Sequence, residues 1–142
     1  MHDSTLYFEK GADAIARAAG LSVRRIRGST LGLVGLGRIG SSVAVRAKAF
    51  GFKISFYDPY KEDGYDKAMG IERCDTIEEL FQKSECISLH CNCTSDNINL
   101  VNAKLLGQMP KGSMFVNTAR GDLVEEVMTL LLVLSSNVFK DF

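Results

Sequence analysis

The sequence predicts an α/β domain built on a doubly wound parallel sheet. Short apolar runs alternate along the chain with segments of helical periodicity, an order typical of parallel sheets. The first run, residues 31–34, is apolar throughout, as expected for a strand covered on both faces. With 142 residues, 46% of them hydrophobic, the chain is long enough for one such domain.

The amino-terminal half is expected to contain two helices around the first strand. The first spans residues 7–21 and ends before Gly28. Its apolar side is formed by Ala12, Ile15, Ala16 and Ala19. The second helix spans residues 38–50. Its buried face is predicted to contain Ile39, Val43, Ala47 and Phe50.

Further strands are expected at residues 53–57, 86–90 and 113–117, the last introduced by a turn at 109–112. A helix over residues 76–83 is indicated by Thr76 as N-cap and Glu79 three positions later, a capping-box pattern. The chain therefore divides into three predicted segments. These are a helix and basic entry segment (1–29), the α/β domain (30–126) and an apolar tail (127–142).

Composition excludes several classes of protein. Lys+Arg and Asp+Glu are equal at 17 each, so charge gives no reason to expect direct nucleic-acid or membrane binding. The basic run at residues 24–27 is more simply a solvated segment. We expect Cys74, Cys86, Cys91 and Cys93 to be free thiols in a reducing compartment, and no metal site.

A glycine motif joins the first strand to the second helix. Gly35, Gly37 and Gly40 form GxGxxG together with Leu36, Arg38 and Ile39. Such glycines permit a tight turn, a close approach of pyrophosphate to the backbone, and close packing of helix on strand. The free N–H groups of the helix start then face the phosphates. The alternative is a purely structural turn, but the strand–turn–helix context favours a Rossmann-type dinucleotide site.

Asp58 ends the second predicted strand, 18 residues after Gly40. A carboxylate there would accept hydrogen bonds from the adenosine ribose hydroxyls and repel a 2′-phosphate. This favours NAD over NADP, although the neighbouring Lys61 weakens the preference.

Five blocks of the sequence resemble a known family. Residues 25–40 (RIRGSTLGLVGLGRIG) are similar to the start of the nucleotide domain of D-isomer-specific 2-hydroxyacid dehydrogenases. Residues 45–52 (VRAKAFGF), 56–60 (FYDPY), 89–92 (LHCN) and 116–121 (VNTARG) resemble the C-terminal-binding proteins more than the metabolic members. The resemblance extends over roughly residues 5–126. It implies a linking helix within 1–29, a partial NAD-binding Rossmann domain at 30–126 whose sheet is truncated at its C-terminal side, and a divergent apolar tail at 127–142.

The resemblance implies roles for two later segments. Residues 91–97 lie where the family's loop wraps the nicotinamide half of the cofactor, which makes Cys91, Asn92 and Asn97 candidate cofactor contacts. Thr118, Ala119 and Arg120 are expected at the same crevice. In the family, the arginine matching Arg120 pairs with the substrate carboxylate, a task suited to its bidentate fork. The alternatives are a plain loop and a surface arginine.

His90 is expected to be structural, because the family's catalytic histidine and its orienting glutamate lie downstream of this position. Neither is expected to have a counterpart in this chain, because residues 127–142 match nothing in the family, so we expect this chain alone to lack turnover. Whether it acts as an enzyme stays open at this point.

Three functions are compatible with these patterns. The first is the NAD(H)-binding domain of a transcriptional co-repressor of the C-terminal-binding-protein type. Resemblance then implies a homodimer formed through this domain, transcription-factor partners, and a location in nucleus and cytoplasm. The others are a metabolic NAD-dependent 2-hydroxyacid dehydrogenase and a non-catalytic dinucleotide-binding or dimerising fragment. The blocks at residues 46–52 and 117–121 favour the co-repressor over the metabolic dehydrogenase.

Overall fold

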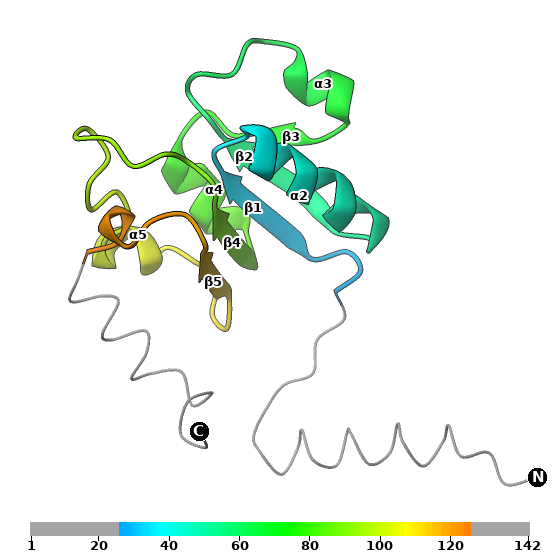
Figure 1. Ribbon diagram of the computed structural model, residues 1–142. Helices are drawn as coiled ribbons and strands as arrows, with labels where there is room; N and C mark the ends of the chain where they lie inside the picture. The colour runs from blue at the N-terminus through cyan, green and yellow to red at the C-terminus, as the bar shows by residue number, and fades with distance from the viewer. Residues whose placement is uncertain (1–25, 126–142) are drawn as a thin grey trace, which may run out of the picture.

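The computed structural model describes residues 26–125, which form a single parallel sheet with helices on both faces (Figure 1). The strands are β1 (Thr30–Val34), β2 (Lys53–Tyr57), β3 (Glu72–Arg73), β4 (Cys86–Leu89) and β5 (Met114–Asn117). Their order is β3-β2-β1-β4-β5, and every pairing is parallel. The predicted Rossmann-type parallel α/β fold is confirmed. The chain moves outward from β1 in one direction and then in the other, so a topological switch point lies between β1 and β4.

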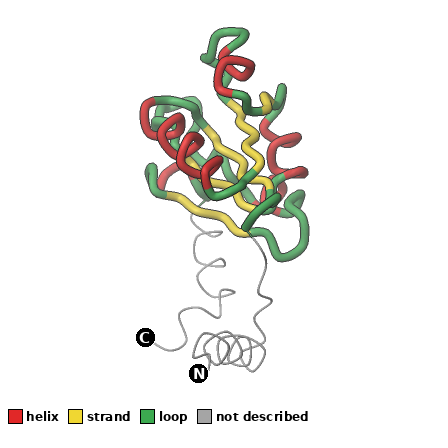
Figure 2. Tube along the Cα trace, turned by 90° about the vertical axis from the view of Figure 1, so that its right-hand side faces the viewer, coloured by secondary structure: helices red, strands yellow, loops and turns green. Residues whose placement is uncertain are grey.

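The helices pack on opposite faces of this sheet. They are α2 (Arg38–Ala49), α3 (Tyr65–Met69), α4 (Ile77–Lys83), α5 (Ala103–Leu106) and the 3-10 helix η1 (Gly121–Leu123). One core cluster joins α2 to Leu33 and Phe56, and the other joins α4 and α5 to Ile87 and Leu89. Seen from the side, the strands lie between two helical layers (Figure 2).

The predicted strands agree with the observed ones to within one residue at each end. Thr76 caps α4 as expected, its Oγ1 accepting a hydrogen bond from the Glu79 amide at 3.2 Å. Four short elements were not predicted, namely α3, β3, α5 and η1. They contain two to five residues, too few to show a periodic pattern.

The predicted buried face of α2 is wrong in part. Ile39 and Phe50 are 68% and 71% exposed. The residues that face the sheet are Gly40, Ala44 and Ala47, with Val43 partly buried beside them. Small side chains let the helix lie close to β1, whereas larger ones would hold it away, and this closeness brings the start of α2 to the end of β1.

The predicted helix over residues 7–21 and the apolar tail at 127–142 lie outside the described residues. All four cysteines are free thiols. Within residues 26–125, no helix is both long and apolar enough to cross a membrane.

Candidate functional site: a groove at the carboxyl ends of the strands

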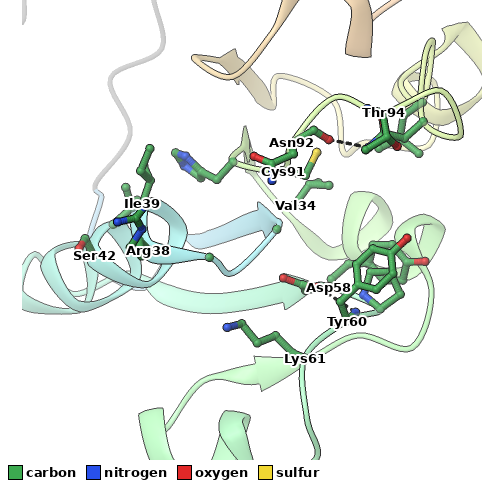
Figure 3. Close-up of a pocket in the computed structure, with 18 of the residues that line it drawn as sticks. Val34, Arg38, Ile39, Ser42, Asp58, Tyr60, Lys61, Cys91, Asn92 and Thr94 are labelled. Carbon is green, nitrogen blue, oxygen red and sulfur yellow. Dashed lines mark hydrogen bonds between the residues drawn. The ribbon is translucent and has the colours of Figure 1, made fainter.

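A groove with a volume of about 1300 Å³ opens where β1, β2 and β4 end (Figure 3). Asp58 and Lys61 stand on one side of it, Cys91 and Asn92 stand on the other, and Val34 lies between them. This is the switch point, where open α/β sheets generally bind ligands. Eight of the predicted cofactor contacts line the groove: Gly35, Gly37, Arg38, Ile39, Asp58, Cys91, Asn92 and Asn97.

Gly35 makes the turn that leads out of β1. Its φ of +90° belongs to the region that favours glycine. A Cβ at this position would also lie 2.7 Å from the backbone nitrogen of Cys91 and 2.9 Å from the carbonyl carbon of His90. The turn therefore requires glycine for both its conformation and its packing.

Gly37 and Gly40 have different structural roles at the start of α2. A Cβ on Gly40 would lie 2.3 Å from the carbonyl oxygen of Gly35, so Gly40 permits close contact between helix and turn. A Cβ on Gly37 would meet no protein atom within 4 Å and would project into free space at the groove. No side chain caps this helix start, so its first N–H groups and its positive dipole end are available to an anion.

Asp58 is held in place by the backbone around it. Its Oδ2 accepts a hydrogen bond from the Leu36 amide at 2.8 Å, and Oδ1 accepts one from the Tyr60 amide at 3.0 Å. An ionised carboxylate offers about four acceptor sites, so each oxygen can accept a further hydrogen bond from a ligand. The first of these contacts ties the end of β2 directly to the glycine turn.

The opposite side of the groove follows β4. His90 Nε2 lies 2.9 Å from the Ser88 hydroxyl, and burial lowers the pKa of His90, which favours the neutral imidazole. Burial raises the pKa of the Cys91 thiol, so Cys91 offers a neutral and weakly polar surface to the groove rather than a thiolate.

Thr118, Ala119 and Arg120 follow β5 and so lie at the same edge of the sheet, because β5 pairs with β4. They do not line the groove. The guanidinium of Arg120 donates from Nη1 to the Ala119 carbonyl at 2.8 Å, and the residue is exposed. The structure therefore brings these residues to the correct edge but does not place them with the other candidate contacts.

Sequence reasoning missed several lining residues, among them Ser42, Arg46 and Tyr60. Ser42 and Arg46 lie four and eight positions after Arg38 on the same helix, so helical spacing could have revealed them. Tyr60 is 91% exposed at the rim beside Asp58. Its aromatic ring in a loop gave no comparable signal in the sequence.

The residues present fit a dinucleotide. The space beside Gly37 admits a phosphate against the backbone, the start of α2 supplies N–H donors, and Asp58 supplies acceptors at the end of the next strand. Fold and groove together define the chain as a Rossmann domain that binds NAD.

Comparison with known proteins identifies the family. Residues 6–140 match the D-isomer specific 2-hydroxyacid dehydrogenase, NAD binding domain, and the chain belongs to this family. The match extends beyond residue 126 into the tail, so the expectation that residues 127–142 match nothing in the family is wrong. It is 44% identical over 116 residues to C-terminal-binding protein 1 of Caenorhabditis elegans, covering 82% of this chain and 16% of that protein. It is 38% identical over 101 residues to the glyoxylate reductase of Korarchaeum cryptofilum, covering 71% and 30%.

A solved structure shares the fold. The apo structure of D-lactate dehydrogenase from Escherichia coli is 36% identical, with a TM-score of 0.72, over 79% of this chain and 35% of that one. The chain thus spans less than a third of the length of the two relatives named above.

Proposed function

We propose that this chain binds NAD(H) in the groove and serves as the nucleotide domain of a co-repressor of the C-terminal-binding-protein type. The main support for this binding site is the empty space beside Gly37, which lies next to a helix start that no side chain caps. In this proposal the first N–H groups of α2 hold the pyrophosphate, and Arg38 adds positive charge beside it. When bound, the cofactor would supply the hydride chemistry of its family.

Asp58 is proposed to hold the adenosine ribose. Its two backbone hydrogen bonds fix the carboxylate, so little side-chain entropy remains to be lost on binding. A 2′-phosphate would meet a negative charge there, which favours NAD(H) over NADP(H). Lys61 could offset this charge, but its ammonium lies 4.5 Å from the centre of the Tyr65 ring, in a cation–π contact.

Substitution of Asp58 tests this site. Asp58→Ala should weaken NADH binding by roughly 1.5 to 3 kcal/mol, the range for a hydrogen bond to a charged group. A titration that follows NADH fluorescence measures the affinity, and thermal unfolding shows whether the variant still folds. Equal affinity for NADH in the folded variant and the unsubstituted chain would remove Asp58 from the site.

The co-repressor assignment rests on similarity of sequence. The identity to C-terminal-binding protein 1 is higher and covers more residues than the identity to the glyoxylate reductase. By the same similarity we propose a homodimer formed through this domain, transcription factors as partners, and a location in nucleus and cytoplasm. Fold alone does not establish any of these, because one fold serves many functions.

The second candidate is a metabolic 2-hydroxyacid dehydrogenase, favoured by the similarity to glyoxylate reductase and D-lactate dehydrogenase. Arg120 would then bind the substrate carboxylate. Purified protein from the native source, assayed with NADH and glyoxylate or pyruvate, distinguishes the two. NADH oxidation that disappears in Arg120→Ala supports the enzyme, whereas nuclear staining and co-purifying transcription factors without turnover support the co-repressor.

A further inference from the structure

The loop after β4 is closed by two side-chain hydrogen bonds of Asn97 and by a backbone bond, in which the Asn97 amide donates to the Thr94 carbonyl at 3.2 Å. Asn97 Oδ1 accepts a hydrogen bond from the Thr94 amide at 2.7 Å, and Asn97 Nδ2 donates one to the Asn92 carbonyl at 2.7 Å. Together these bonds of the half-buried Asn97 close residues 92–97 into a compact turn. Asn92, Thr94 and Asn97 all line the groove. Asn92 and Thr94 lie on the side opposite Asp58 (Figure 3).

These two bonds require an amide. The backbone N–H of Thr94 can only donate and the carbonyl of Asn92 can only accept, so the side chain must present an oxygen to one and an NH₂ to the other. Aspartate at position 97 would keep the bond to Thr94 but place a negative oxygen against the Asn92 carbonyl. Alanine would lose both bonds and leave the two backbone groups to water.

The far end of the loop is anchored separately. The amide of Asn99 donates to the Asp122 carbonyl at 2.8 Å, and the amide of Val101 donates to the Leu123 carbonyl at 2.9 Å. These bonds tie the chain after position 98 to the segment around η1. Loss of the Asn97 bonds should therefore free the groove-facing turn at 92–97 and leave the remainder of the domain in place.

The position of this turn indicates which part of the ligand it meets. The strands run β2, β1, β4 across the floor of the groove. With the adenosine ribose at Asp58 after β2 and the pyrophosphate at the start of α2 above β1, the rest of the dinucleotide extends over the end of β4. The turn at 92–97 therefore faces the nicotinamide half.

We infer that Asn97 is a positioning residue, which acts on the cofactor by holding Asn92 and Thr94 in the conformation that receives the nicotinamide half. This role is additional to the direct contact expected from the sequence, because the two bonds to the backbone use one acceptor site and one donor of the amide and leave one of each. The inference rests on the proposed binding of NAD(H) in the groove.

Two ligands measured by calorimetry on the 142-residue chain test the inference. NADH reaches both halves of the groove, whereas ADP carries only the adenosine and the two phosphates. Asn97→Ala and Asn97→Asp should bind NADH at least roughly fivefold more weakly, the equivalent of one net hydrogen bond. Their affinity for ADP should change less than about twofold, well within the value of a single hydrogen bond.

Asn102→Ala is the matched control. Asn102 also uses its side-chain oxygen to accept a backbone amide, that of Leu105 at 3.0 Å, but it caps α5 and lies outside the groove lining. This variant should lose stability and keep the ratio of NADH to ADP affinity. An Asn97 variant that keeps that ratio overturns the inference alone. Failure of the unsubstituted chain to bind either ligand overturns the proposed function and the inference together.

Discussion

Gly37→Ala should separate nucleotide binding from folding. Gly37 has φ −74° and ψ −160°, which alanine adopts readily, and an added Cβ would meet no protein atom within 4 Å. The substitution raises the free energy of unfolding by roughly 0.4 to 1 kcal/mol, because alanine restricts the unfolded chain. It lowers the free energy of unfolding by a similar amount, about 0.5 to 1 kcal/mol, because alanine is a poorer N-cap than glycine. The free energy of unfolding should therefore change by less than about 1 kcal/mol.

Binding should respond far more strongly. The new methyl group would occupy the space through which a phosphate approaches the first N–H groups of α2. Losing one hydrogen bond to a charged oxygen costs about 1.5 to 3 kcal/mol. The affinity for NADH should therefore fall roughly 10- to 150-fold, since each 1.4 kcal/mol is a factor of ten.

Gly35→Ala provides the contrast. Alanine at this position would have a φ of +90°, and its Cβ would lie 2.7 Å from the backbone nitrogen of Cys91, so the substitution strains the turn itself. The left-handed conformation alone costs about 1 to 2 kcal/mol, so this variant should lose stability as well as binding. Urea unfolding and NADH fluorescence, measured on both variants, give the comparison. If folded Gly37→Ala binds NADH as tightly as the unsubstituted chain, the assignment of the phosphate to the start of α2 is refuted.

Three further predictions concern titration, reactivity and association. Burial lowers the pKa of His90 below 6.5 in the folded state, so protonation of His90 favours the unfolded chain. The free energy of unfolding should therefore fall as the pH drops from about 6.5 to the lower pKa of the folded state. His90→Asn should reduce the fall in urea-unfolding free energy between about pH 7 and pH 5.5, and an equal fall would contradict the reasoning. Burial raises the pKa of the Cys74 thiol to about 11, and the residue is 2% exposed. Iodoacetamide at about pH 8 should therefore modify Cys74 only after unfolding, as peptide mass spectrometry would show. Met114 is 64% exposed on β5, the outer strand of the described sheet, so Met114→Lys should lower self-association in sedimentation velocity, and an unchanged distribution would exclude this edge as the contact.

The strands and the glycine turn were predictable because their signals are local. A buried parallel strand is a short apolar run, and the glycine spacing has meaning as soon as it follows such a run and precedes a helix. Asp58 was predictable for the same reason, since it ends the next strand. What the sequence did not reveal is that the carboxylate also accepts a hydrogen bond from Leu36, 22 positions away.

Features that depend on tertiary contact were harder to predict. The apolar stripe of α2 suggested that Ile39 and Phe50 are buried, but the helix packs through its smallest residues, Gly40, Ala44 and Ala47. Hydrophobicity alone predicts that isoleucine and phenylalanine are buried in preference to glycine and alanine. The small residues are buried in α2 because the helix lies close to the sheet.

The hydrogen bonds of Asn97 were hidden for a similar reason. A polar residue in a loop at a ligand groove suggests a ligand contact, whereas its two hydrogen bonds to the backbone of its own loop are visible only in the structure. Thr118, Ala119 and Arg120 were placed by sequence at the correct edge of the sheet, but β5 lies one strand further from the groove than β4.

A structure of this chain determined with NAD bound tests the central claim most directly. We expect the pyrophosphate to lie against the backbone at Gly37, the adenosine ribose to be hydrogen-bonded to Asp58, and the nicotinamide half to lie beside the turn at 92–97. A nucleotide bound elsewhere, for example in the smaller cavity lined by Lys48, Lys53 and Glu72, with the groove at the ends of β1, β2 and β4 left free, would contradict it.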